Sequence, residues 1–180
     1  MKAMNRMLRV ALPLAAALAL SACGFHLRRS AALPPSMSHV HLVVSGGGDL
    51  ERALTRALEN ANVAVEDAAG PGVAELRVPV AAFGTQSLTQ GGYVRITEYA
   101  VNYNVEFDVT GADGKTVLPH QRISMQREYS YDSTDTVGNA SQVQQIQRSL
   151  VDDMVQAIMF RLEAAGRHAQ DTPATGTGEH

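Results

Sequence analysis

The chain has 180 residues, a formal net charge of −3 and a single cysteine, and it contains no tryptophan. One cysteine excludes an intramolecular disulfide and a cysteine-based metal cluster. The acidic balance argues against a general nucleic-acid binder. The low aromatic content, 5% of all residues, argues against a sugar groove lined by aromatic side chains.

The first 22 residues have the layout of an export signal. Lys2, Arg6 and Arg9 form a positive start, and an apolar run follows that is too short to span a bilayer as a helix. The segment Leu20–Cys23 then matches the lipobox, in which the cysteine carries the lipid. The alternative is an ordinary secreted protein with an incidental free thiol. We predict a signal peptide over residues 1–22 and acylation of Cys23 as the new N-terminus.

The residue after Cys23 predicts where the lipoprotein goes. It is Gly24, whereas an Asp at this place usually retains a lipoprotein in the inner membrane, so the outer membrane is predicted. Removal of the signal takes three of the 15 Lys and Arg residues with it and leaves 12 against 18 acidic residues, a formal charge of −6. The remaining length suffices for one domain with its own core.

The first half of the mature chain predicts a strand, a helix and a second strand. Residues 23–38 read as a lipidated N-terminus and an extended segment, and residues 39–44 as a strand. A Gly46–Gly48 turn precedes a helix with Asp49 as its N-cap, which ends near Asn60 and Asn62. The next strand, over residues 73–83, alternates at Leu76, Val78 and Val80, and Pro79 within it indicates a position at the sheet edge.

The second half predicts a long hairpin and a helix. After a polar loop over residues 86–93, a strand is predicted from Arg95 to Val109, in which apolar residues recur at every second position from Tyr99 to Val109. A turn over residues 112–115 leads to a return strand with the same alternation. After a loop over residues 132–139, Ser141 and Gln144 form a capping box for a helix that Gly166 ends, and residues 167–180 are expected to be disordered.

These elements predict an α+β fold. It is a two-layer sandwich in which two amphipathic helices cover one face of a four-stranded, mostly antiparallel sheet, in the order β-α-β-β-β-α. We expect a single domain over residues 39–166.

No catalytic or metal-binding pattern stands out. The glycines at 46–48 lack the Lys and Ser/Thr of a phosphate loop, and His39 with His41 lacks a third metal ligand. Glu98, Glu106 and Asp108 share a strand face, as either a catalytic carboxylate pair or, more simply, a solvated sheet surface. We predict no enzyme, no cofactor and no metal.

One stretch resembles a known family more specifically. The hexapeptide Cys23–Arg28 (CGFHLR) resembles the mature start of the LptE family of outer-membrane lipoproteins. Thr97–Tyr99 (TEY), which opens the long strand, and Arg127–Asp132 (REYSYD), which closes its partner, fit the same family. The resemblance covers residues 23–166. Arg29 is a departure, since the family more often has Gly there, and the loops lack an obvious basic cluster.

The resemblance implies a role in lipopolysaccharide assembly. LptE-like proteins plug the LptD β-barrel, help it assemble, and take part in delivering lipopolysaccharide to the outer leaflet. It therefore implies an outer-membrane lipoprotein on the periplasmic side, in a 1:1 complex with an LptD-like barrel. The alternatives are an auxiliary lipoprotein of an ABC-type lipid-trafficking system and, less favoured, a lipoprotein enzyme that acts on the cell wall.

A lipopolysaccharide site would need arginines for the lipid A phosphates. Hairpin pairing is expected to bring Arg127 close to Tyr99, and therefore near Arg95 at the start of the long strand. Arg95 with Arg127 is the candidate patch. The alternative is that both form exposed salt bridges with Glu98 and Glu128, each worth at most about 1 kcal/mol.

Overall fold

The computed structural model describes residues 33–88, 96–132 and 134–171. The chain divides into two compact units, Met1–Ser30 and Ala31–His180, of which only the second contains described residues. Its elements are a short 3₁₀ helix, five strands and two long helices, in the order η1 (Pro35–Met37), β1 (His39–Val44), α2 (Gly48–Asn60), β2 (Ala64–Glu66), β3 (Ala74–Ser87), β4 (Ile96–Thr110), β5 (Thr116–Asp132) and α3 (Thr136–Asp171).

The five strands form one mixed sheet in the order β2-β1-β3-β4-β5. β1 runs parallel to both β2 and β3, while β3, β4 and β5 pair antiparallel. The α+β class and its two helices are confirmed. The four-stranded, mostly antiparallel sheet and the order β-α-β-β-β-α are wrong in detail, because β2 was not predicted and it adds a parallel pair beside β1. Three residues are too few to show an alternation.

The end of α2 explains why β2 lies there. Asn62 adopts a positive φ of 62°, the left-handed conformation that Asn tolerates better than most residues. The Val63 amide donates to the Leu58 carbonyl at 3.0 Å and the Asn62 amide donates to Glu59 at 2.9 Å, which is the Schellman pattern of a helix end. The helix thus stops sharply and turns the chain into β2. The predicted helix end near Asn60 and Asn62 is confirmed.

The start of α2 differs from the prediction. The N-cap is Gly47, without a side-chain hydrogen bond, and Asp49 lies in the first turn, where it pairs with Arg52. Asp49 as N-cap was therefore wrong. A Cβ at Gly47 would lie 3.0 Å from Cβ of Ala81 and 3.3 Å from Cγ1 of Val44. The glycine turn allows the chain to pass close to β3 as it enters the helix.

A bulge in β3 changes which side chains face the helices. The pairing of β3 with β4 shifts between Arg77 and Val80, the segment that contains Pro79. Val78 is buried but Val80 is only half-buried, so the predicted alternation Leu76, Val78, Val80 breaks at the proline. β3 is the central strand of the five, but Pro79 lies just past the end of its pairing with β1, so the predicted edge position holds locally. Pairing with β1 ends at Val78, so Pro79 disturbs only one neighbour.

The long hairpin is the part that the sequence predicted best. β4 and β5 pair from Ile96↔Asp132 to Thr110↔Thr116, and the turn between them has Gly114 at a φ of 76°. The apolar positions of β4 face the core as predicted, and these are Val101, Tyr103, Val105, Phe107 and Val109.

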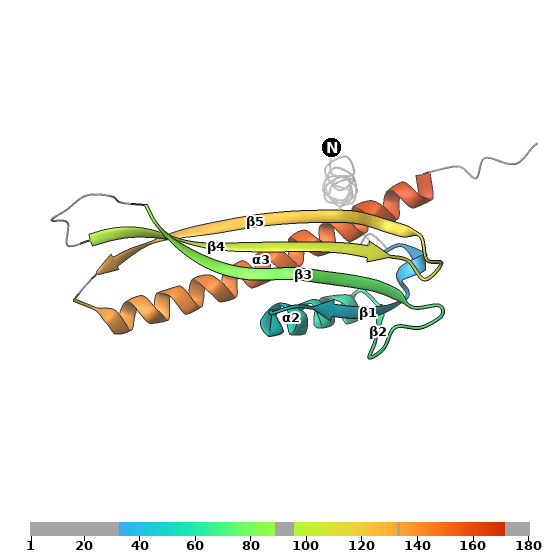
Figure 1. The fold of residues 1–180 in the computed structure, drawn as a ribbon, viewed down its shortest axis with the longest axis horizontal. Coiled ribbons are helices and arrows are strands. Elements are labelled where there is room, and N and C mark those ends of the chain that lie inside the picture. The colour runs from blue at the N-terminus through green and yellow to red at the C-terminus, as the bar shows by residue number, and fades with distance from the viewer. Residues whose placement is uncertain (1–32, 89–95, 133, 172–180) are drawn as a thin grey trace, which may run out of the picture. The chain divides into compact units, whose positions relative to one another are not determined.

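Both helices cover the same face of the sheet. The apolar stripe of α2 (Leu50, Leu54, Leu58) and that of α3 (Leu150, Met154, Ile158, Leu162) join the inward residues of β1, β3, β4 and β5 in one core. Figure 1 shows α3 lying along the long strands, with the shorter α2 beside β1. The prediction of two helices on one face is confirmed.

α3 is longer than predicted at both ends. It begins at Thr136 instead of Ser141, because Asp135 Oδ1 accepts a hydrogen bond from the Gly138 amide at 2.8 Å and caps the first turn. The buried Asn139 also ties this turn to β5 by donating to the Asp132 carbonyl at 2.6 Å. The helix continues through Gly166 to Asp171, so the predicted stop at Gly166 was wrong.

Candidate functional site: the polar face of the long strands

The sheet face opposite the helices carries the polar half of the hairpin alternation. On β4 this face presents Asn102, Asn104, Glu106 and Asp108, and the register places Gln126, Ser124 and Arg122 of β5 opposite the first three. On β3 the same pairing adds Arg77 before the bulge. We call this surface, over β3, β4 and β5, the polar face.

Charged residues on the polar face are paired across strands. Arg77 donates to Asp108 Oδ2 from Nη2 at 2.7 Å and from Nε at 3.1 Å. This hydrogen bond and the charge of Asp108 raise the pKa of the Arg77 guanidinium above its ordinary value. Arg122 pairs with Glu106, and His120 Nε2 lies 3.5 Å from the other oxygen of that carboxylate. Positive and negative charges therefore alternate across the surface.

These pairs account for two of the three acidic residues that could have formed a catalytic carboxylate pair, Glu106 and Asp108. Glu106 and Asp108 each bind an arginine of a neighbouring strand, which is a structural role on a solvated sheet. Next to the Arg122–Glu106 pair along the hairpin, Ser124 Oγ donates to Asn104 Oδ1 at 2.5 Å. The five large apolar side chains that are exposed within the described ranges lie outside β4 and β5, and they are Val43, Phe83, Leu88, Val137 and Phe160.

Of the predicted site residues, the structure describes Arg127 alone. Arg127 pairs with Val101 in the register, on the helix side of the sheet, and Nη2 donates to Asp153 Oδ2 of α3 at 2.6 Å. The expected salt bridge with a strand-end glutamate is thus replaced by a contact with the helix. Tyr99 lies opposite Tyr129, two positions further along. Cys23, Gly24 and Arg95 lie outside the described residues.

The two histidines of β1 serve the sheet edge. His39 Nδ1 contacts Glu66 Oε1 at 2.8 Å, and His41 Nδ1 contacts the Glu66 carbonyl at 3.0 Å. Both contacts tie β1 to β2. Across the part of the chain that the structure describes, no three His, Cys, Asp or Glu side chains gather where a metal ion could bind.

Sequence reasoning missed a gathering of aromatic side chains on the helix side. Tyr99 stacks on Tyr129 with ring centres 5.7 Å apart and meets Tyr131 edge-on at 5.8 Å. Burial raises the pKa of Tyr129. Phe83 stacks on Tyr103 at 4.0 Å. The tyrosines share one parity and were visible in the sequence, but Phe83 joins them only because the bulge reverses the phase of β3.

None of the helices described in the structure is long and apolar enough to cross a membrane. A search of curated proteins gave no match.

Solved structures with this fold come from several bacteria. A minor lipoprotein from Acinetobacter baumannii is 22% identical with a TM-score of 0.59, and the match covers 71% of this chain and 92% of that one. The rare lipoprotein B from Shewanella oneidensis is 21% identical with a TM-score of 0.62, over 73% and 98%. An uncharacterized lipoprotein B from Nitrosomonas europaea is 19% identical with a TM-score of 0.64, over 87% and 99%.

These solved structures share the fold of this chain, and a match to a family model shows which family the chain belongs to. The model of the LptE family, described as lipopolysaccharide-assembly, matches residues 35–162, which span the domain from η1 into the last turns of α3. The predicted resemblance to this family is confirmed over residues 35–162, which include the TEY and REYSYD segments, while the CGFHLR segment precedes the match. The chain therefore belongs to the LptE family of lipopolysaccharide-assembly proteins.

Proposed function

We propose that this protein is an outer-membrane lipoprotein that binds an LptD-like β-barrel in a 1:1 complex and assists lipopolysaccharide assembly at that membrane. Cys23 carries the acyl chains, and Gly24 permits sorting to the outer membrane. The domain lies on the periplasmic side and acts as plug and assembly factor for the barrel.

The observation that carries this proposal is the polar face of β3, β4 and β5. The lumen of an outer-membrane barrel is polar, and a domain that enters it must present hydrogen-bonding groups in place of an apolar patch. Asn104 and Ser124 lie in the middle of the polar face, and arginine–carboxylate pairs lie further along it. Such a surface exchanges hydrogen bonds with a polar wall without burying unpaired charge.

The lipopolysaccharide-binding role is proposed for Arg95 and Arg127. The side chain of Arg127 is 48% exposed and is held by Asp153, which is 43% exposed. A lipid A phosphate would therefore have to displace or share a carboxylate already bound to this guanidinium. The Arg127 side chain is exposed enough to reach a ligand, but its guanidinium already has a carboxylate partner.

Purification of the acylated protein from membranes tests the proposal. A stoichiometric complex with one large outer-membrane β-barrel is expected, because the polar face needs a polar partner. Recovery with an inner-membrane ATP-driven transporter, and no barrel, would overturn it. Depletion of the protein should also lower the amount of correctly assembled barrel, measured by its resistance to unfolding in unheated detergent gels.

A further inference from the structure

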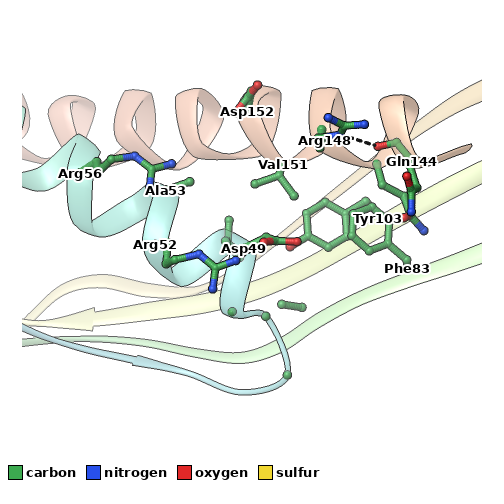
Figure 2. A pocket seen from close by; sticks show the side chains of 16 residues that line it. Asp49, Arg52, Ala53, Arg56, Phe83, Tyr103, Gln144, Arg148, Val151 and Asp152 are labelled. Carbon is green, nitrogen blue, oxygen red and sulfur yellow. Dashed lines mark hydrogen bonds and ion pairs between the residues drawn. The ribbon is translucent and has the colours of Figure 1, made fainter. Parts of the chain in front are cut away.

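A groove opens on the helix side of the sheet, away from the polar face. Its volume is about 760 Å³. It lies where β3 and β4 pass the N-terminus of α2, between that helix and α3 (Figure 2). This volume falls within the range of roughly 300–1,000 Å³ that small-molecule sites occupy.

One wall of the groove is an aromatic surface. Phe83 is 40% exposed although it is a large apolar residue, and it stacks on Tyr103, which is only 1% exposed, with an interplanar angle of 12°. Small residues border the rings, Ala81 on β3 and Gly46–Gly48 in the turn, so the space in front of them stays open. The fixed Tyr103 ring holds Phe83 in place as a flat apolar surface.

The two helices supply cations to the groove. Arg52 and Arg56 lie one turn apart on α2, and Arg148 lies on α3. Arg52 pairs with Asp49. Over the described ranges, in contrast, neither Arg56 nor Arg148 makes a salt bridge with a carboxylate, and Arg148 only donates to the Gln144 carbonyl of its own helix at 3.3 Å. Arg77, Arg122 and Arg127 all have carboxylate partners.

The remaining polar residues complete a site of mixed character. Gln144 and Gln147 of α3 line the groove and offer amide donors and acceptors. Asp152 is the second carboxylate in the lining; it lies one turn after Arg148 on the same face of α3, and Figure 2 shows it on the side of the helix away from the rings. The lining thus carries three arginines against two aspartates in a chain whose net charge is −3.

We propose that this groove binds the phosphorylated sugar headgroup of a glycolipid. Guanidinium groups without carboxylate partners suit a phosphate, which they bind in a bidentate manner. The ring of Phe83 suits the apolar face of a sugar, and the two glutamines suit its hydroxyl groups. The inference rests on the proposed function for the choice of a glycolipid, and it places the headgroup in a groove that Arg127 does not line.

Binding of lipid A to the full-length acylated protein in detergent tests this inference. The arms are lipid A with its phosphates, lipid A without them, phosphatidylglycerol vesicles, and inorganic phosphate as competitor. The variant is Arg56→Glu with Arg148→Glu, and the matched control is Arg167→Glu, an exposed arginine of α3 that contacts Phe160 instead of a carboxylate. Circular dichroism and thermal unfolding check that each variant folds.

The expected result is a loss of lipid A affinity of about tenfold or more in the double variant, with affinity in the control unchanged. The wild type should bind phosphate-free lipid A more weakly than lipid A. The double variant should bind phosphate-free lipid A with nearly the same affinity as the wild type does. Phe83→Ala should weaken both forms of lipid A. Inorganic phosphate should compete only at high concentration, and phosphatidylglycerol should bind more weakly than lipid A.

Several results would overturn the inference while leaving the proposed function intact. They are wild-type affinity in a folded double variant, equal binding of phosphate-free lipid A, and equal binding of phosphatidylglycerol. Absence of any lipid A binding by the wild type would overturn both this inference and the binding role proposed for Arg95 and Arg127, while the complex with the barrel would stand. Failure of the proposed function would show elsewhere, as the absence of a barrel from the purified complex.

Discussion

Two arginines placed in the centre of the polar face should block docking without unfolding the domain. The perturbation is Asn104→Arg with Ser124→Arg, at positions directly opposite in the β4–β5 register. It removes the 2.5 Å hydrogen bond from Ser124 Oγ to Asn104 Oδ1. Loss of an exposed hydrogen bond costs about 0.5–1.5 kcal/mol, and like charges facing each other across strands add roughly 0.2–1 kcal/mol. The sum, about 1–2.5 kcal/mol, is small beside the ~5–15 kcal/mol that stabilises a typical domain.

The assay compares folding with complex formation. Urea unfolding of the purified variant should give a free energy of unfolding lower than that of the wild type by that amount. Far less barrel should co-purify with the variant from membranes, because the added side chains occupy the contact surface. Gln142→Arg with Gln145→Arg is the control, since it adds the same bulk and charge at exposed positions of α3. Wild-type recovery of the barrel by the Asn104/Ser124 variant, with the predicted loss of stability, would refute the docking face.

Three further predictions concern the anchor, the sorting and the core. Cys23→Ser should abolish acylation and leave an uncleaved precursor or a soluble form, and fatty-acid label retained by this variant would contradict the assignment. Gly24→Asp should hold the lipoprotein in the inner membrane and lower the amount of assembled barrel, which membrane fractionation measures; an unchanged distribution would count against the sorting role. Burial, followed by the charge of Asp49, raises the pKa of Tyr103 from 10.0 to about 12. Its hydroxyl therefore stabilises the fold fully below pH 10 and loses this contribution as the pH rises toward 12. Wild type should lose about 2 kcal/mol more than Tyr103→Phe between pH 9 and 12, and parallel pH profiles would exclude this cause.

The periodic parts of the fold could be predicted from the sequence because each is long enough to reveal its period. The alternation from Tyr99 to Val109 assigned the two faces of β4 correctly, and the apolar stripe of α3 assigned its buried side. β2 could not be found this way, because three residues between a helix end and a loop carry no period. It exists because β1 offers it a parallel edge, which is a contact between distant segments.

The candidate sites were harder to predict for the same physical reason. The bulge at Pro79 reverses the phase of β3, and this alone brings Phe83 to the side of Tyr103. The contact from Arg127 to Asp153 joins residues 26 apart, and it depends on where α3 crosses β5. Local patterns can place a residue on a face of its own element. They do not show which neighbour that face will meet.

Site-specific photocrosslinking in cells tests the central claim most directly. A photoreactive residue at Gln126, an exposed position on the polar face opposite Asn102, is compared with one at Gln142 on α3. The account predicts that the Gln126 probe crosslinks to a single large outer-membrane β-barrel much more strongly than the Gln142 probe does. Crosslinking of Gln126 to an inner-membrane transporter, or a barrel crosslink that forms from Gln142 and not from Gln126, would contradict the claim that the polar face docks to the barrel.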